Sequence, residues 1–203
     1  MIVADQPTLM MLWQPAIRWQ ALAYQSCWML VGSLLIGISA WLAVPFYPVP
    51  MTGQTLVVLL LGAAQGPRLA MGTVALYLLE GALGLPVFSH GRAGPAMLIG
   101  PTAGYLFGFL LAAGLVGWLA QMGWDRRFRT TFLAMLIGNI QIYVLGICWL
   151  IFGMGVSIPT AFKVGLYPFV IGDLAKICLA SLVLPACWRY LGRQASGLPA
   201  DRN

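Results

Sequence analysis

The chain has 203 residues and a formal net charge of +6, with 61% hydrophobic and only 8% charged residues. A soluble domain is typically about one quarter charged, so this composition excludes an ordinary soluble globular protein and indicates an integral membrane protein in contact with lipid. The basic residues collect in particular loops, which explains the positive charge without a nucleic-acid partner.

Six apolar stretches predict six transmembrane helices, packed as one all-α integral membrane bundle with structured outer loops. Their expected ranges are 21–43, 54–65, 68–85, 97–121, 131–153 and 169–190. The second stretch is short for a hydrocarbon layer of about 30 Å, so it must recruit residues 50–53 or be shielded by its neighbours. We expect one transmembrane domain over residues 1–203, with a cytoplasmic or interfacial lead-in over 1–20 and a cytoplasmic tail over 191–203. The lead-in is either a short amphipathic segment in the membrane interface or a disordered leader.

The arginines predict the orientation in the membrane. With six spans, one side of the membrane holds Arg18, Arg68, Arg126, Arg127, Arg129, Arg189, Arg193 and Arg202, and the other holds Arg92 and Lys163. Cytoplasmic loops carry the excess of basic residues, so both termini are expected in the cytoplasm. No cleavable signal peptide is expected, because Asp5 stands where a basic region would be.

Three loops on the expected outer face carry most of the remaining information. Pro45, Pro48 and Pro50 exclude a helix and predict a rigid, extended segment. Residues 86–104 are rich in glycine and proline and are expected to turn sharply. This stretch combines aromatic faces with hydrogen-bond donors at Phe88, His90, Arg92, Thr102 and Tyr105. The third loop is expected over residues 153–168.

Asp173 and Lys176 place a carboxylate and an ammonium on one face of the last helix, since they are three residues apart. If that helix begins near residue 168, the two side chains lie about 6 and 10 Å below its outer end. Charged groups within the membrane usually line a cavity, so the pair is a candidate ligand site open to the outside. The competing interpretation is an ion pair that only stabilises the start of the helix.

Further candidate contacts for a ligand are distributed along the chain. Glu80 lines the same cavity, carries a proton or pairs with Arg68 or Lys176; the competing interpretation is a protonated or hydrogen-bonded packing residue. Asn139 and Tyr143 lie one turn apart and either touch the ligand or join helices. Arg92 is the arginine expected on the outer face, where its planar fork suits a carboxylate. The remaining candidates are Gln54, Phe88 and Tyr105.

The sequence offers no support for an enzyme. It contains no G-x-S-x-G, H-E-x-x-H or G-x-x-x-x-G-K-[ST] pattern, and its sole histidine, His90, adjoins Ser89. The four cysteines have no C-x-x-C or metal-ligand spacing. We therefore expect no catalytic residue, metal site or cofactor, and any ATP hydrolysis must come from another subunit.

Five motifs follow one another in the chain: Pro48-Val-Pro-Met-Thr-Gly-Gln-Thr55, Gly62-Ala-Ala-Gln-Gly-Pro-Arg68, Tyr77-Leu-Leu-Glu-Gly-Ala-Leu-Gly-Leu-Pro-Val-Phe88, Gly100-Pro-Thr-Ala-Gly-Tyr-Leu-Phe-Gly-Phe109 and Pro168-Phe-Val-Ile-Gly-Asp-Leu-Ala-Lys176. Together, between about residues 40 and 185, they resemble the BioY family of biotin-binding substrate components (S components) of energy-coupling factor (ECF) transporters.

The resemblance implies a bacterial inner-membrane protein that captures biotin from outside, together with a transmembrane coupling protein and two ABC-type ATPase subunits. It places Asp173 and Lys176 in the biotin site, where lysine serves either the ureido oxygen or the valerate carboxylate. It also implies docking through small residues of the first helix, here Ser33, Gly37 and Ala40. Because no extended alanine ladder is present, a biotin transporter that acts alone is a competing hypothesis. A substrate component for another vitamin is a second, and an intramembrane enzyme or assembly factor, which belongs to another class of protein, is a third.

Overall fold

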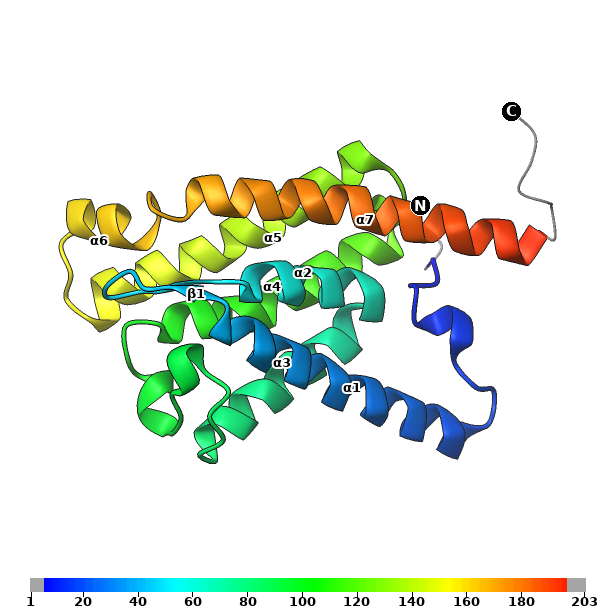
Figure 1. Ribbon diagram of the computed structural model, residues 1–203, viewed down its shortest axis with the longest axis horizontal. Coiled ribbons are helices and arrows are strands. Elements are labelled where there is room, and N and C mark those ends of the chain that lie inside the picture. Colours follow the sequence, from blue (N-terminus) through cyan, green and yellow to red (C-terminus); the bar gives the residue numbers. More distant parts are fainter. Residues whose placement is uncertain (1–5, 197–203) are drawn as a thin grey trace.

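The computed structural model describes residues 6–196, and side chains as far as Leu191. Within this range the regular secondary structure is helical apart from one short hairpin (Figure 1). The helices are α1 (Arg18–Trp41), α2 (Gln54–Gln65), α3 (Pro67–Ala82), α4 (Ala103–Gln121), α5 (Phe128–Cys148), α6 (Ile158–Gly165) and α7 (Val170–Ser196). Strands β1 (Ala43–Val44) and β2 (Met51–Thr52) pair antiparallel. A π-helical turn, Trp149–Gly153, extends α5.

Four of the six expected spans are long and apolar enough to cross a bilayer. They correspond to Arg18–Trp41, Ala103–Gln121, Phe128–Gly153 and Val170–Leu191. The expected range of α2 is confirmed, but its 12 residues reach only about 18 Å. The 16 residues of α3 reach about 24 Å.

Two expectations about the boundaries were wrong. The fourth stretch becomes helical at Ala103 rather than at residue 97, because residues 95–98 form a separate 3-10 turn and Pro101 follows it. The third outer loop contains α6, which begins after Ser157 with Pro159 in its first turn, where the missing N–H of proline costs no hydrogen bond.

Helix α4 lies at the centre of the bundle and contacts α2, α3 and α5. Its glycines permit this close packing. A Cβ atom on Gly117 would lie 2.5 Å from the backbone nitrogen of Pro67, and one on Gly108 would lie 3.0 Å from the Cα atom of Ile142. Small residues let helix backbones approach closely where burial from water gives no driving force, as in a bilayer.

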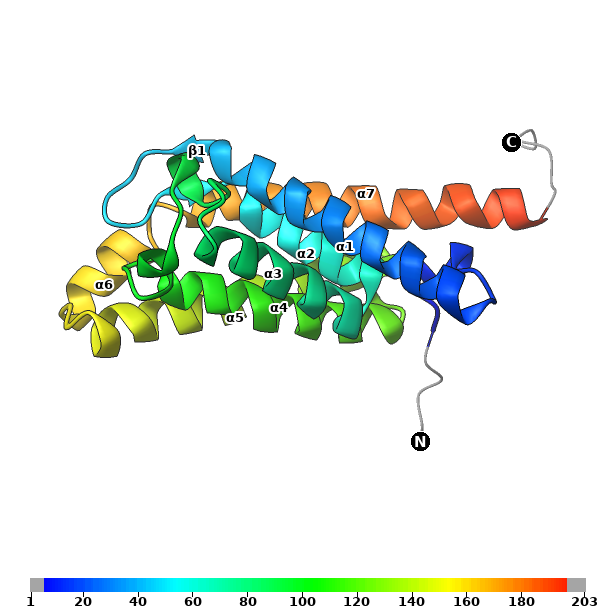
Figure 2. The same ribbon diagram turned by 90° about the horizontal axis from the view of Figure 1, so that it is seen from below.

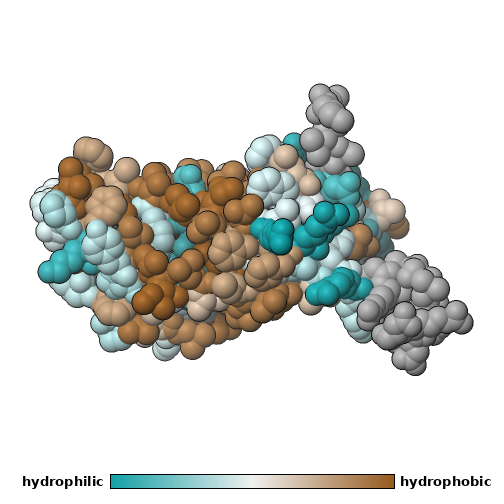
Figure 3. Space-filling model, turned by 90° about the horizontal axis from the view of Figure 1, so that it is seen from above, coloured by the Kyte–Doolittle hydropathy of each residue, from teal (hydrophilic) through white to brown (hydrophobic). Residues whose placement is uncertain are grey.

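The outer surface of the bundle is apolar, as a lipid-facing surface requires. Figure 3 shows hydrophobic residues across the middle of one face and hydrophilic residues toward its two ends. On α1, for example, Leu34 and Ile38 are 58% and 63% exposed. This distribution agrees with the membrane protein that the composition indicates.

The segments between helices are ordered against the bundle. The proline-rich segment is not helical, as predicted, and forms the β1–β2 hairpin. Gly91 and Gly94 adopt positive φ angles of 70° and 94°, so the expected sharp turns are confirmed. In the lead-in, the backbone N–H of Gln6 donates to Gln121 and that of Met10 donates to Ala64. The described part of the lead-in therefore packs across the ends of α4 and α2.

A cluster around a buried carboxyl group joins three segments at the same end of the bundle. Asp125, which is 2% exposed, accepts a hydrogen bond of 2.5 Å from the indole Nε1 of Trp188 on α7. The guanidinium of Arg126 lies 4.4 Å from the centre of the Trp188 ring and donates to the carbonyl of Pro7. Burial raises the pKa of Asp125 above its ordinary value of 3.8. The expected tail over residues 191–203 begins within α7, and residues 197–203 lie outside the described residues.

Candidate binding site

A cavity with a volume of about 60 Å³ lies where the first turns of α2, α4 and α7 meet β2 and the loop after α3. We call it the main cavity. Much of its wall is apolar, including Phe88, Phe109 and Phe169. Its polar wall contains Thr52, Gln54, Thr55, Tyr143, Asp173 and Lys176. A largely apolar cavity with a few convergent polar groups is typical of a small-molecule site.

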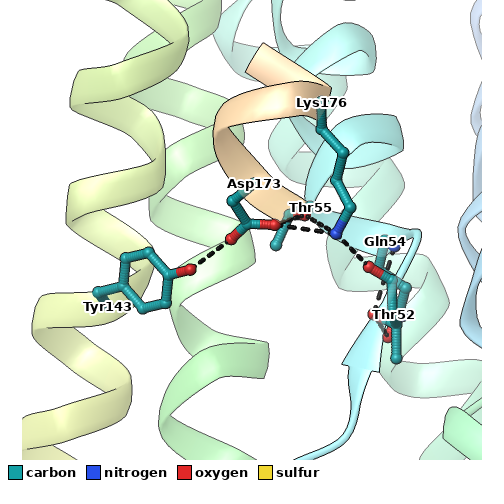
Figure 4. Close-up of polar contacts among 6 residues, drawn as sticks. All are labelled: Thr52, Gln54, Thr55, Tyr143, Asp173 and Lys176. Atoms are coloured by element: carbon teal, nitrogen blue, oxygen red, sulfur yellow. Dashed lines mark hydrogen bonds and ion pairs between the residues drawn. The ribbon is translucent and has the colours of Figure 1, made fainter. Parts of the chain in front are cut away.

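The predicted ion pair is present and lies in this cavity (Figure 4). The Lys176 Nζ atom is 2.8 Å from Asp173 Oδ1, and the two side chains are 20% and 5% exposed. Helix α7 begins at Val170, close to the expected start, so both residues fall in its first two turns. The other carboxylate oxygen of Asp173 accepts a hydrogen bond of 2.5 Å from the Tyr143 hydroxyl on α5.

Two threonines complete the polar network and were not predicted. The Thr55 hydroxyl donates to Asp173 Oδ1 at 3.0 Å, and Lys176 donates to the Thr52 carbonyl at 2.6 Å and to Thr55 Oγ1 at 3.2 Å. Figure 4 shows these groups converging from α2, β2 and α7. Both threonines belong to the motif over residues 48–55, which is the signal in the sequence that points to them.

The other residues at the cavity are held by contacts of their own. Gln54 is 4% exposed and donates to the Tyr77 hydroxyl at 2.7 Å. Phe88 packs edge-on against Tyr77, with ring centroids 5.5 Å apart. The Tyr105 hydroxyl donates to the carbonyl of Gly165 at the end of α6 at 2.8 Å. Each of these side chains therefore has a fixed orientation before any ligand binds.

Three candidate residues do not line the main cavity. Glu80 accepts a hydrogen bond of 3.0 Å from Ser33 and so joins α3 to α1. Arg92 is exposed, although its carbonyl accepts from the backbone N–H of Phe88, which places its backbone beside a residue that does line the cavity. Asn139 lines a smaller, separate cavity.

The residues predicted to dock a partner face the inside of the bundle. Ser33 and Ala40 are 0% exposed. Gly37 is buried, and a Cβ atom there would lie 3.4 Å from the Cβ atom of Val87. In this arrangement the small residues of α1 serve contacts within the chain, and the outward face of α1 presents large apolar side chains instead.

Two helix N-termini are directed at the main cavity. Gln54 and Thr55 open α2, and Asp173 lies in the first turn of α7. The N-terminal end of a helix carries a partial positive charge. At α7 the Asp173 carboxylate already meets this charge, so the end of α2 is the one that favours a ligand with hydrogen-bond acceptors.

Comparisons with known proteins agree with this arrangement. Residues 14–193 match the model of the BioY family. The "Biotin transporter BioY" of Thermotoga maritima is 40% identical over 153 residues, which cover 75% of this chain and 89% of that protein. "Biotin transporter BioY2" of Lactococcus lactis is 36% identical, covering 75% and 83%. The crystal structure of an S-component for biotin from an ECF-type ABC transporter shares the fold, with a TM-score of 0.72, 24% identity and coverage of 86% and 95%.

Proposed function

The chain belongs to the BioY family, and from that premise we propose that it binds biotin in the main cavity as the first step of biotin uptake. The resemblance drawn from five sequence motifs is confirmed. The relatives are named as transporters, which supports a binding and transport protein rather than an enzyme.

The observation that carries the proposal is the ion pair of Asp173 and Lys176 in the wall of a largely apolar cavity. Biotin combines a polar ureido group with an apolar bicyclic ring and a carboxylate chain. Asp173 can accept from a ureido N–H, and Lys176 can donate to the ureido oxygen or to the valerate carboxylate. Phe88, Phe109 and Phe169 supply apolar surface for the rings.

Binding must then rearrange hydrogen bonds that already exist. The ammonium of Lys176 has three protons, and they serve Thr52, Thr55 and Asp173. A ligand gains from Lys176 only by replacing one of these acceptors. We propose that biotin replaces the Thr52 carbonyl, because the Asp173 contact compensates the lysine charge in a poorly hydrated site.

We further propose six transmembrane spans in the cell membrane with both termini cytoplasmic. Figures 1 and 2 place the start of α1 and the end of α7 at the same end of the molecule, away from α6. Arg18, Arg68, Arg126 and Arg189 belong to that end by their positions in the chain. The short helices α2 and α3 complete the count of six, and α2 is shielded by its contacts with α1, α3 and α4. This orientation opens the main cavity to the outside.

We propose that a transmembrane coupling protein and two ABC-type ATPases energise uptake. The support is the fold shared with an S-component of an ECF-type transporter and the absence of a phosphate-binding loop from the sequence. Because Ser33, Gly37 and Ala40 are buried, docking through them requires α1 to separate from its neighbours, and uptake by the chain alone is the competing proposal.

The direct test is equilibrium binding of radiolabelled biotin to the purified protein in detergent or nanodiscs. Saturable binding that excess unlabelled biotin abolishes, and that thiamine and riboflavin leave unchanged, is the expected result. Binding of another vitamin in preference to biotin would assign the site to that vitamin. Lack of saturable binding by folded protein would refute the proposal.

A further inference from the structure

A chain of hydrogen bonds on α5 leads from the interior of the bundle to the ion pair. Asn139 and Tyr143 are one turn apart on the same face of the helix, and their side chains form a hydrogen bond. The Tyr143 hydroxyl donates in turn to Oδ2 of Asp173 (Figure 4), whose other oxygen accepts from Thr55 and Lys176. Tyr143 and Asp173 line the main cavity, whereas Asn139 does not.

The direction of this chain follows from the number of protons. A tyrosine hydroxyl has one proton, and the carboxylate of Asp173, which can only accept, receives it. Tyr143 therefore has only a lone pair left for Asn139, so Asn139 must donate from its NH₂ group. In agreement, the other polar atom of this amide, Oδ1, is buried without a hydrogen-bond partner among the described residues.

The unpaired oxygen makes asparagine unfavourable for folding at this position. Asn139 is 5% exposed, and an amide oxygen that loses its bonds to water without gaining a donor lowers stability. Most of the small cavity that Asn139 lines is apolar, with walls from Leu56, Leu59, Met135, Ile177 and Ala180. An apolar side chain of similar shape would suit these neighbours better, so stability alone does not explain the asparagine.

We propose that Asn139 is a positioning residue, which acts on the ligand by fixing the proton of Tyr143 on Asp173. Because the Asn139 amide occupies the lone pair of Tyr143, the hydroxyl cannot turn away from the carboxylate. A carboxylate offers about four lone-pair sites. Thr55 and Lys176 use those of Oδ1 and Tyr143 uses one of Oδ2, which leaves one site on Oδ2 for a ligand N–H. This role rests on the proposed function, whereas the direction of the hydrogen bonds does not.

A double-mutant cycle tests the role. Leucine resembles asparagine in shape but has no donor, so Asn139→Leu should weaken biotin binding about fivefold, the loss expected for one neutral hydrogen bond. In a Tyr143→Phe background the same change should have no further effect, because the proton that Asn139 fixes is gone. An equal loss in both backgrounds, or no loss in either, would overturn the positioning role.

Thermal unfolding separates this role from a structural one. Asn139→Leu should unfold at the same temperature as wild type or at a higher one, because the unpaired oxygen is removed. Thr131→Val is the matched control on α5, since Thr131 is 0% exposed and its hydroxyl is hydrogen-bonded to the carbonyls of Trp124 and Arg127. This control should unfold at a lower temperature and bind biotin like wild type. The same pair of results for Asn139→Leu would make Asn139 a structural residue.

Asn139→Asp decides the question if leucine is not tolerated, because it keeps the shape of asparagine. Once ionised, the introduced carboxylate can only accept, so it competes with Asp173 for the proton of Tyr143. Biotin binding by this variant, relative to wild type, should therefore weaken as the pH rises. The other ionisable groups around Tyr143 are Asp173, Tyr105 and, through Asp173, Lys176, and wild-type protein shares them. Equal binding by the two proteins at every pH would overturn the proposal.

A crystal structure keeps the two proposals distinguishable. If wild-type protein does not bind biotin, the proposed function fails, and the structure still decides the direction of the chain. We expect Asn139 Nδ2 within hydrogen-bond distance of the Tyr143 hydroxyl, and the hydroxyl within hydrogen-bond distance of Asp173. A Tyr143 hydroxyl that has left Asp173 to donate to Asn139 Oδ1 would overturn the inference.

Discussion

Replacing Asp173 by asparagine is the sharpest test of the binding site. The carboxylate accepts three hydrogen bonds, from Thr55, Lys176 and Tyr143. Asparagine keeps one acceptor oxygen and replaces the other with an NH₂ group, which meets either the Lys176 ammonium or the Tyr143 hydroxyl as a donor. The substitution therefore removes a contact and leaves the charge of Lys176 without a counterion.

The expected magnitude follows from the contact that biotin loses. A hydrogen bond to a charged acceptor contributes about 1.5–3 kcal/mol, and asparagine offers a ureido N–H only a neutral oxygen. The side chain of Asp173 is 5% exposed, so water does not replace the lost acceptor. A loss of about 1.4 kcal/mol or more in binding free energy is a conservative expectation, and it corresponds to at least a tenfold weaker dissociation constant.

Binding of radiolabelled biotin to purified Asp173→Asn protein measures this loss, with a thermal unfolding scan to show that the variant is folded. Asp125→Asn is the matched control, since it makes the same chemical change at a buried aspartate at the other end of the bundle, and it should leave biotin binding unchanged. An unchanged dissociation constant for folded Asp173→Asn would show that the pair only stabilises the start of α7.

Three further outcomes are expected. Lys176→Met should weaken biotin binding, and the double variant with Asp173→Asn should bind no better than either single variant; rescue by the second change would mean that Lys176 only neutralises Asp173. We predict that Arg92 holds the valerate carboxylate, which is not free in biocytin, so wild-type protein should bind biotin more tightly than biocytin and Arg92→Ala should bind the two equally. If Arg92→Ala still prefers biotin, Lys176 is the partner of the carboxylate. The raised pKa means that folded protein holds the Asp125 proton more tightly than the unfolded chain does. The contribution of this residue to stability is therefore full below pH 3.8 and declines as the pH rises through the raised pKa. Unfolding temperatures measured across the pH range should show this decline in the wild-type protein and lack it in Asp125→Asn.

Sequence patterns predicted the helices where the apolar stretch had clear ends. The range predicted for α2, residues 54–65, was correct because Gly53 and Gly66 stand at the two ends of an apolar run. The start of α4 was misplaced, because hydropathy continues through residues 97–100 while Pro101 interrupts the helix. Helix α6 was missed, because eight residues flanked by glycine and proline carry too weak a periodic signal to distinguish them from a loop.

The binding site was predictable in part. Asp173 and Lys176 stood out because charge is rare within a membrane span. Their partners Thr52 and Thr55 are more than 115 residues away in the chain, with separations of 124 and 118 for the Lys176–Thr52 and Thr55–Asp173 hydrogen bonds. Ordinary threonines become part of a site only through the packing of β2 and α2 against α7, which periodicity does not encode. The same limit explains Glu80, whose Ser33 partner on α1 no local pattern identifies.

The glycines of α4 also bear on how the protein moves. A methyl group has no space at Gly62, Gly108 or Gly117, so α4 lies in backbone contact with α2, α5 and the turn before α3, and a rotation or shift of α4 would drive its side chains into these backbones. We therefore expect α2, α3, α4 and α5 to travel as one rigid body during a transport cycle. The rearrangements that admit and release cargo then fall to the periphery: the β1–β2 hairpin, the loop after α3, and the first turns of α7.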